Sequence, residues 1–192
     1  MYPTDLTEPQ WQFIQKTLEL VNRKRKHSLR SIWNAINYLV KSGCQWRMLP
    51  SNFPKWQLVY YYYSKWSYLE QFDLLLSKLT ERVRINKGQN AQPSLGIIDS
   101  QSVRWGNNRS LNGFDGNKKV KGIKRHVVVD RNGFLLAVMV TVANVHDSKA
   151  VLLLMRTLKY FLCPIKIILD NDKCSGKLLN KLKIDLDILF KS

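Results

Sequence analysis

Apolar residues in the first part of the chain recur at the spacing of α-helices. Thr7 and Gln10 have the spacing of a capping box, Ser28 can cap a second helix, and Gly43 can end it. The apolar positions form four groups: Leu6, Trp11, Ile14 and Leu18; Ile32, Ile36, Leu39 and Val40; Val59, Tyr60, Tyr63 and Trp66; Leu69, Phe72, Leu76 and Leu79. The pattern therefore predicts four short helices, in a small all-α domain at residues 1–85.

The pattern changes after a polar segment at residues 84–93, which contains Gly and Pro. Asn132-Gly133 lies between two apolar runs, which predicts an antiparallel hairpin, and residues 148–161 are long enough for a crossover helix capped by Asp147. The strand after such a helix would be parallel. The predicted strands are Leu95–Ile98, His126–Val129, Phe134–Val142 and Ile165–Leu169, followed by a helix at 176–183 and a strand at 184–190. We predict a mixed α/β domain at residues 94–192.

The net charge of the chain indicates what kind of partner it binds. The chain has 31 Lys and Arg against 14 Asp and Glu, a net charge of +17, which favours a polyanionic partner such as DNA. The longest apolar run, residues 134–145, is too short to span a membrane, and the N-terminus lacks the pattern of a secretory signal. The three cysteines form no C-x-x-C pair and are read as buried thiols. We expect a cytoplasmic protein.

Two aspartates stand at the ends of predicted strands, Asp99 in GIIDS and Asp170 in IILDND. A single aspartate in this position more often caps the following loop, but two on central strands of a basic α/β domain favour a divalent-metal site. Phosphoryl transfer uses such sites, because paired metal ions stabilise the attacking and the leaving oxygen. A complete site needs a third acid. Asp172 is a nearby candidate, although a solvated turn residue is the better interpretation of it.

Basic residues gather in a predicted loop between Asp99 and His126. Residues 100–125 contain seven Lys and Arg and four Gly, a composition that favours contact with a phosphate backbone over a merely solvated loop. The residues that we expect at DNA from this stretch are Arg104, Lys118, Lys119, Lys121, Lys124 and Arg125.

A second basic cluster consists of Arg23, Lys24, Arg25 and Lys26, with Arg30 shortly after it. It suits DNA contact and an exposed interhelix loop equally well. The aromatic segment at residues 56–66 could stack on bases, but its spacing favours a packed helix. His126 and His146 have no metal-ligand partner at useful spacing, so we expect them to be structural or to contact phosphate.

These residues also carry a family resemblance. The segments LTEPQWQFI and KHSLRSIWNAINYLVKSGCQWRMLPSNFPKWQLVYYYYSKW resemble the N-terminal insertion-element domain of bacterial transposases of the insertion-sequence-five type. GIIDSQSVR, GFDGNKKVKGIKRHVVVDRNGFLLAV and ANVHDS are similar to the start of their catalytic domain. The resemblance implies an RNase H-like DDE domain in which Asp99 is the first acid and Asp170 the second, two Mg²⁺ ions as cofactors, and cleavage and transfer of DNA at terminal inverted repeats. It also implies a homodimer in the bacterial nucleoid.

Two departures from the family pattern stand out. Asp170 is followed by Asn171-Asp172-Lys173, where relatives usually have Gly-Gly-Tyr, and no Glu occurs after Glu81. The family's catalytic Glu lies beyond the fifth strand, so the RNase H-like domain is expected to be incomplete and the transposase C-terminally truncated and inactive alone. The alternative is a non-catalytic DNA-binding remnant that represses transposition. Both hypotheses use the same basic surfaces, and the sequence leaves them open.

Overall fold

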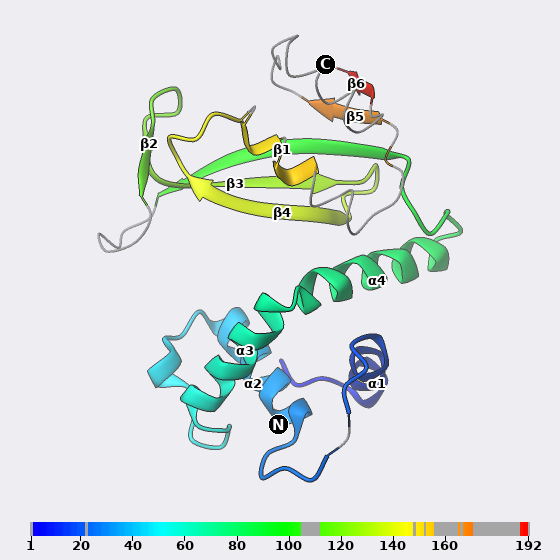
Figure 1. Cartoon of the computed structure of the whole chain (residues 1–192), viewed down its shortest axis with the longest axis vertical. Coiled ribbons are helices and arrows are strands. Elements are labelled where there is room, and N and C mark those ends of the chain that lie inside the picture. The colour runs from blue at the N-terminus through cyan, green and yellow to red at the C-terminus, as the bar shows by residue number, and fades with distance from the viewer. Residues whose placement is uncertain are drawn as a thin grey trace. The chain divides into compact units, whose positions relative to one another are not determined.

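The computed structural model describes residues 2–21, 23–104, 112–147, 149–151, 153–155, 165, 167–170 and 189–191. The helices are α1 (Glu8–Thr17), α2 (Leu29–Ser42), the 3₁₀ helix η1 (Trp46–Met48), α3 (Trp56–Tyr68) and α4 (Gln71–Asn86); the strands are β1 (Leu95–Arg104), β2 (Gly113–Asp115), β3 (Val120–Val129), β4 (Leu135–Val142), β5 (Ile167–Asp170) and β6 (Leu189–Lys191) (Figure 1). A helical region thus precedes a mixed sheet, which confirms the predicted α/β fold class with an all-α N-terminal part.

The chain divides into two compact units, Met1–Leu75 and Leu76–Ser192. The division lies within α4, ahead of the polar segment where the sequence predicts the domain boundary. The side chains of α4 explain this position. Leu75 belongs to the helical core, whereas Thr80 Oγ1 donates a hydrogen bond to the carbonyl oxygen of Leu135 at 3.1 Å and Arg84 pairs with the buried carboxylate of Asp130.

The capping signals of the N-terminal unit act as the sequence predicts. Gln10 Oε1 accepts a hydrogen bond from the Thr7 amide at 2.8 Å, and Ser28 Oγ accepts one from the Ser31 amide at 3.1 Å. Gly43 ends α2 in the left-handed conformation with φ of 67°. These local bonds satisfy amides and carbonyls that the helix ends leave without partners.

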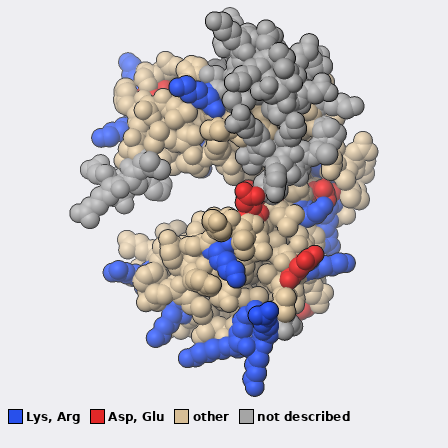
Figure 2. Space-filling model, viewed as in Figure 1, with Lys and Arg blue, Asp and Glu red and all other residues tan. Residues whose placement is uncertain are grey.

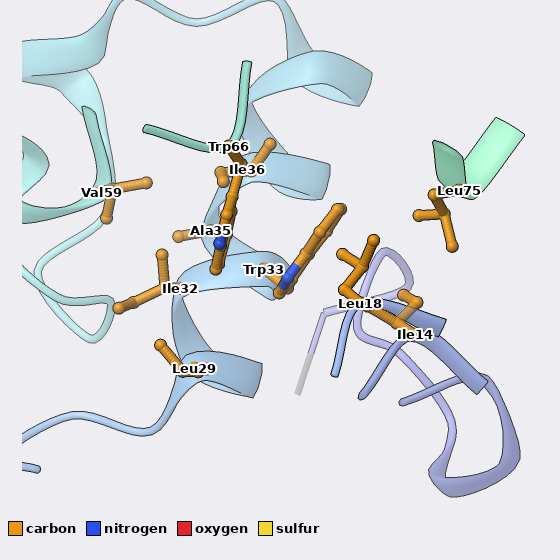
Figure 3. Packing of buried hydrophobic residues seen from close by; sticks show 10 residues of the cluster. All are labelled: Ile14, Leu18, Leu29, Ile32, Trp33, Ala35, Ile36, Val59, Trp66 and Leu75. Carbon is orange, nitrogen blue, oxygen red and sulfur yellow. The ribbon is translucent and has the colours of Figure 1, made fainter. Parts of the chain in front are cut away.

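A cluster of aliphatic and aromatic side chains forms the core of this unit. The rings of Trp33 and Trp66 stack with centroids 4.9 Å apart, beside the fully buried Ala35 and Val59. The side chains in Figure 3 come from all four helices and point toward one another: Ile14, Leu18, Leu29, Ile32, Trp33, Ala35, Ile36, Val59, Trp66 and Leu75. The packing fixes α3 against α2 through Val59 and Trp66.

The spacing of the tyrosine segment of α3 favours a position in this core, but the segment does not lie wholly in it. Tyr62 is half-buried and packs against Trp66, with ring centroids 5.3 Å apart. Tyr60, Tyr61 and Tyr63 are exposed. Four consecutive tyrosines cover the whole turn of a helix, so one of them faces inward whatever the others do.

The second unit is built on a sheet with the strand order β2-β3-β1-β5-β6, and β4 pairs with β3. The predicted hairpin is present: β3 and β4 are antiparallel, and Gly133 in the turn has φ of 80°. β5 pairs with β1 in the parallel direction, as expected after a crossover helix. Residues 149–151 and 153–155 are helical, and Val151, Leu154 and Met155 pack on one face of the sheet. The helix begins one residue earlier than expected, since His146 O accepts from the Lys149 amide.

Two strands are longer than the sequence predicts. β1 continues through Arg104 and β3 begins at Val120, while the short β2 pairs with β3. Much of the predicted basic loop is therefore sheet. Its Lys, Arg, Ser and Gln residues hide the alternation, because both faces of these strand ends carry polar side chains. The predicted helix at 176–183 lies outside the described residues, as do Cys163 and Cys174, whereas Cys44 is a half-buried free thiol.

Candidate active site and nucleic-acid surface

The two candidate acids lie on neighbouring strands. In the parallel register of β1 and β5, Asp170 is the partner of Ile98, the residue directly before Asp99. Asp99 is exposed, and its Oδ1 accepts a hydrogen bond from the Ser100 amide at 2.8 Å. The third candidate, Asp172, lies outside the described residues. The sheet topology therefore brings together the backbone positions of two acids that are 71 residues apart in the chain.

Asp99 lies on the open face of the sheet. Its neighbours Gly96 and Ile98 point to the buried face, where Ile98 joins the core, and Ile97 on the side of Asp99 is exposed. The antiparallel register puts Val127 opposite Asp99 and Arg125 opposite Gln101, on the same face. Arg125 is exposed and donates to Gln101 Oε1 at 3.0 Å. An accessible carboxylate thus shares a face with a cation that can meet a phosphate.

The donors available at this position suit a hard divalent cation. Mg²⁺ prefers carboxylate oxygens and usually takes one or two from the protein. Asp99 offers one such carboxylate on β1, and the backbone of Asp170 lies beside it on β5. Within the described ranges, no group of three His, Cys, Asp or Glu side chains could hold a metal ion.

Most of the basic residues expected at DNA from the second unit are exposed. These are Arg104 at the end of β1, Lys118 and Lys119 in the turn after β2, and Lys121 and Arg125 on β3. Lys118 Nζ donates to the carbonyl oxygen of Ser100 at 2.8 Å, so this turn is attached to β1 beside Asp99. In Figure 2, Lys and Arg side chains stand out on the face in view and few Asp or Glu accompany them.

Lys124 is the exception and corrects the sequence prediction. Its side chain is 6% exposed, and its Nζ lies 3.2 Å from Asp115 Oδ2 and 3.2 Å from Asp147 Oδ1. The Nζ also donates to the carbonyl oxygen of Val145 at 3.3 Å. Strand alternation is the reason: Lys124 shares the buried face of β3 with His126 and Val128. Lys124 is therefore not part of the exposed basic surface but the centre of a buried polar cluster.

The electrostatics of this cluster favour the ionised form of Asp115 and the neutral form of His126. The pKa of Asp115 is lowered far below its usual range by a hydrogen bond from Ser102 Oγ at 2.6 Å, by the Lys118 amide and by Lys124, against the effect of burial. Burial lowers the pKa of His126, helped by Lys124 and opposed by Asp147. His126 Nε2 lies 2.9 Å from Thr141 Oγ1. His126 is thus structural, one of the roles expected for it, and His146 is exposed.

The basic residues of the N-terminal unit have two different surroundings. Arg23, Lys24, Arg25 and Lys26 are exposed in the segment between α1 and α2. Arg30 is half-buried, pairs with Glu8 and donates to the carbonyl oxygen of Leu6 at 2.7 Å. Arg30 therefore ties α2 to the start of α1, and its guanidinium is already engaged.

Sequence reasoning missed three ion pairs that two buried cations make. Asp115 and Asp147 meet at Lys124, and Arg84 meets Asp130, whose pKa is lowered because hydrogen bonds from Phe134, Asn132 and Arg84 outweigh the effect of burial. One signal was present: Asp115 is the lone acid within the basic stretch. An isolated acid among seven cations is a candidate for a buried pair.

Comparison with protein families agrees with this geometry. Residues 6–76 match the family described as "Putative transposase of IS4/5 family (DUF4096)". Residues 90–188, more than half of the chain, match the transposase DDE domain. The chain belongs to the DDE transposases. The resemblance seen in the sequence is thereby confirmed at the level of the family. No curated protein and no solved structure gives a match.

Membership of the DDE transposases implies DNA as the substrate and DNA transposition as the process. DDE domains usually work with divalent metal ions, which agrees with the exposed carboxylate of Asp99 on β1. Among the helices that the structure describes, none is long and apolar enough to cross a membrane.

Proposed function

We propose that the chain is a transposase of a bacterial insertion sequence, which binds the element's terminal inverted repeats in the nucleoid and processes DNA strands with Asp99 and Asp170 as metal ligands. The observation that supports the proposal is the register of β1 and β5, in which the backbone of Asp170 pairs with Ile98, directly before Asp99, within a DDE domain. Exposed Lys118, Lys119, Lys121 and Arg125 supply positive charge around the same sheet. The geometry suits phosphoryl transfer on a polyanion.

The expected metal pair would be held by Asp99 and Asp170, with the substrate phosphate and water completing its coordination. When bound, divalent ions stabilise the charge on the attacking and leaving oxygens. Arg125 contributes by neutralising a phosphate on the face of the sheet where Asp99 is exposed. The Ser100 amide orients Asp99 through its hydrogen bond to Oδ1.

The 192 residues contain no Glu after Glu81, so the family's third acid has no counterpart in the catalytic part of this sequence. We propose that these residues on their own bind DNA ends better than they cut them. A non-catalytic repressor of transposition is the second candidate function. The absence of a Glu after Glu81 favours it. Occupation of the inverted repeats by this chain would block them for an active transposase.

A nicking and strand-transfer assay on the element's own end DNA, with Mg²⁺ or Mn²⁺, tests the proposal. The variants are Asp99→Ala and Asp170→Ala, and Asp73→Asn on α4 is a matched control that removes one charge elsewhere. Metal-dependent nicking that both aspartate variants abolish, and the control keeps, supports the metal site. Intact end binding without nicking supports the repressor. Absence of binding to any duplex overturns both candidate functions.

A further inference from the structure

The exposed face of α3 has a composition that the core of the N-terminal unit does not explain. Tyr61 is 57% and Tyr68 87% exposed, although tyrosine usually buries much of its ring. The two residues are seven positions apart, and Gln57, Ser64 and Lys65 are exposed between or beside them. On a helix these five residues lie along one stripe. We call them the α3 face.

We propose that the α3 face is a contact surface for double-stranded DNA. The proposal deepens the proposed function, on which it rests, by assigning a DNA-contacting element to the N-terminal unit. It differs from the contact expected at Arg23–Lys26, because it names a helix with side chains that can reach bases rather than a basic segment between helices.

The first argument is rigidity. The inner side of α3 is fixed by Val59, which is fully buried, and by Trp66, which is 3% exposed and stacks on Trp33. Tyr62 packs on the same side against Trp66. The tyrosines on the outer side are therefore exposed on a well-packed helix, and ordering this surface upon binding costs little conformational entropy.

The second argument is charge. α3 contains no Asp or Glu, and the basic Lys55 and Lys65 are exposed at its start and in its last turn. The N-terminal unit as a whole has ten Lys and Arg against five Asp and Glu. A helix without carboxylates on a basic unit complements a phosphate backbone, which repels acidic side chains.

The third argument is chemistry and size. Amide, hydroxyl and phenol groups donate and accept hydrogen bonds, and glutamine matches the major-groove edge of adenine. The major groove of DNA, about 12 Å wide, admits one α-helix. α3 has 13 residues and exposes the five of the α3 face over its length. Lys65 adds a phosphate contact at the end of the same stripe.

The experiment measures the affinity of the full 192-residue chain for a labelled mixed-sequence duplex and for duplexes from the ends of its element, over a series of salt concentrations. The test variants are Tyr61→Ala combined with Tyr68→Ala, and separately Lys65→Ala. The matched controls are Val40→Ala, an exposed apolar residue on α2, and Lys16→Ala, an exposed lysine on α1. Tryptophan fluorescence and circular dichroism check that each variant is folded.

We expect the tyrosine double variant to bind end DNA about tenfold more weakly or worse, with an unchanged salt dependence. Lys65→Ala should lower the slope of log affinity against log salt concentration by about 0.9, which is the contribution of one phosphate contact. Both controls should bind like the parent chain. Folded tyrosine and lysine variants that bind as tightly as the parent would overturn the proposal and leave the proposed function standing.

Two other outcomes are distinguishable. If the parent chain binds no duplex, the proposed function fails and this inference fails with it. If the tyrosine variant changes the sedimentation of the DNA-free protein from dimer to monomer and leaves affinity per monomer unchanged, the α3 face is a contact between copies, which overturns the assignment to DNA.

Discussion

At the scale of single residues, burial decides which cations can meet DNA. Lys124 and Lys121 are three positions apart on β3, yet the first is buried and paired and the second is exposed. A basic stretch in a sequence therefore mixes two kinds of lysine. Those on the inner face stabilise the fold, and those on the outer face remain free to contact a phosphate.

Replacing Lys124 with Met tests its structural role. The change leaves the buried Asp115 and the nearby Asp147 without their shared cation, which should lower the free energy of unfolding by about 3 kcal/mol. Lys121→Met, on the exposed face, should change it by less than about 0.5 kcal/mol. Urea unfolding followed by circular dichroism measures both. Equal stability of the two variants would show that the ion pairs contribute nothing net.

His126 predicts a pH dependence of stability. Its pKa is lowered in the folded chain, mainly by burial, so the unfolded chain binds a proton more readily. Stability should therefore fall as the pH drops through the usual histidine pKa of about 6.5. His126→Gln should flatten the dependence of the unfolding midpoint on pH between pH 7 and pH 5. The midpoint is measured at steps of about one pH unit. A flat profile in the parent chain would refute the assignment.

At the scale of elements, the sequence predicts what local chemistry determines. The caps at Thr7 and Ser28, the turn at Gly133 and the parallel strand after the crossover helix follow from residue type and spacing. The length of β1 does not, because Ser100, Gln101 and Ser102 continue the strand on pairing with β3. Propensity is weak there and tertiary context decides. Asp170 ends β5 as predicted, but the prediction of Asp99 at a strand end is wrong, because β1 continues through Arg104 and Asp99 lies within it. The adjacency of the two acids depends on the sheet order.

Gly113 in β2 gives an element-scale prediction. A Cβ there would lie 2.6 Å from Asn144 Oδ1 and 2.7 Å from the Asn144 amide nitrogen, so Gly113→Ala must displace β2. Since β2 leads into the turn with Lys118 and Lys119, the variant should lose about 1–3 kcal/mol of stability and bind DNA more weakly. Gly116→Ala is the control, because a Cβ there meets no atom within 4 Å. Thermal unfolding and DNA affinity are measured for both variants. A Gly113→Ala variant with the stability and the DNA affinity of the parent chain would contradict this prediction.

At the scale of the whole molecule, the proposed DNA binding depends on the positive charge that both units carry. Ten of the 31 Lys and Arg belong to the first unit and the rest to the second, so each unit can neutralise phosphates by itself. Two attached DNA-binding units raise affinity without new contacts when both can engage one duplex. The exposed cations expected at the DNA lie in separate segments, Arg23–Lys26 before α2 and Lys118–Lys121 around the start of β3.

This division predicts additive salt effects. Replacing Lys119 with Ala should lower the slope of log affinity against log salt by about 0.9, the share of one phosphate contact, and Lys24→Ala should do the same in the other unit. The double variant should lose both contributions, because the effects of sites without shared partners add. Lys124 is buried in the polar cluster, so its charge does not contact DNA. Lys124→Arg keeps that charge and should leave the slope of log affinity against log salt unchanged. A double variant with the slope of either single variant would mean that one unit alone holds the DNA.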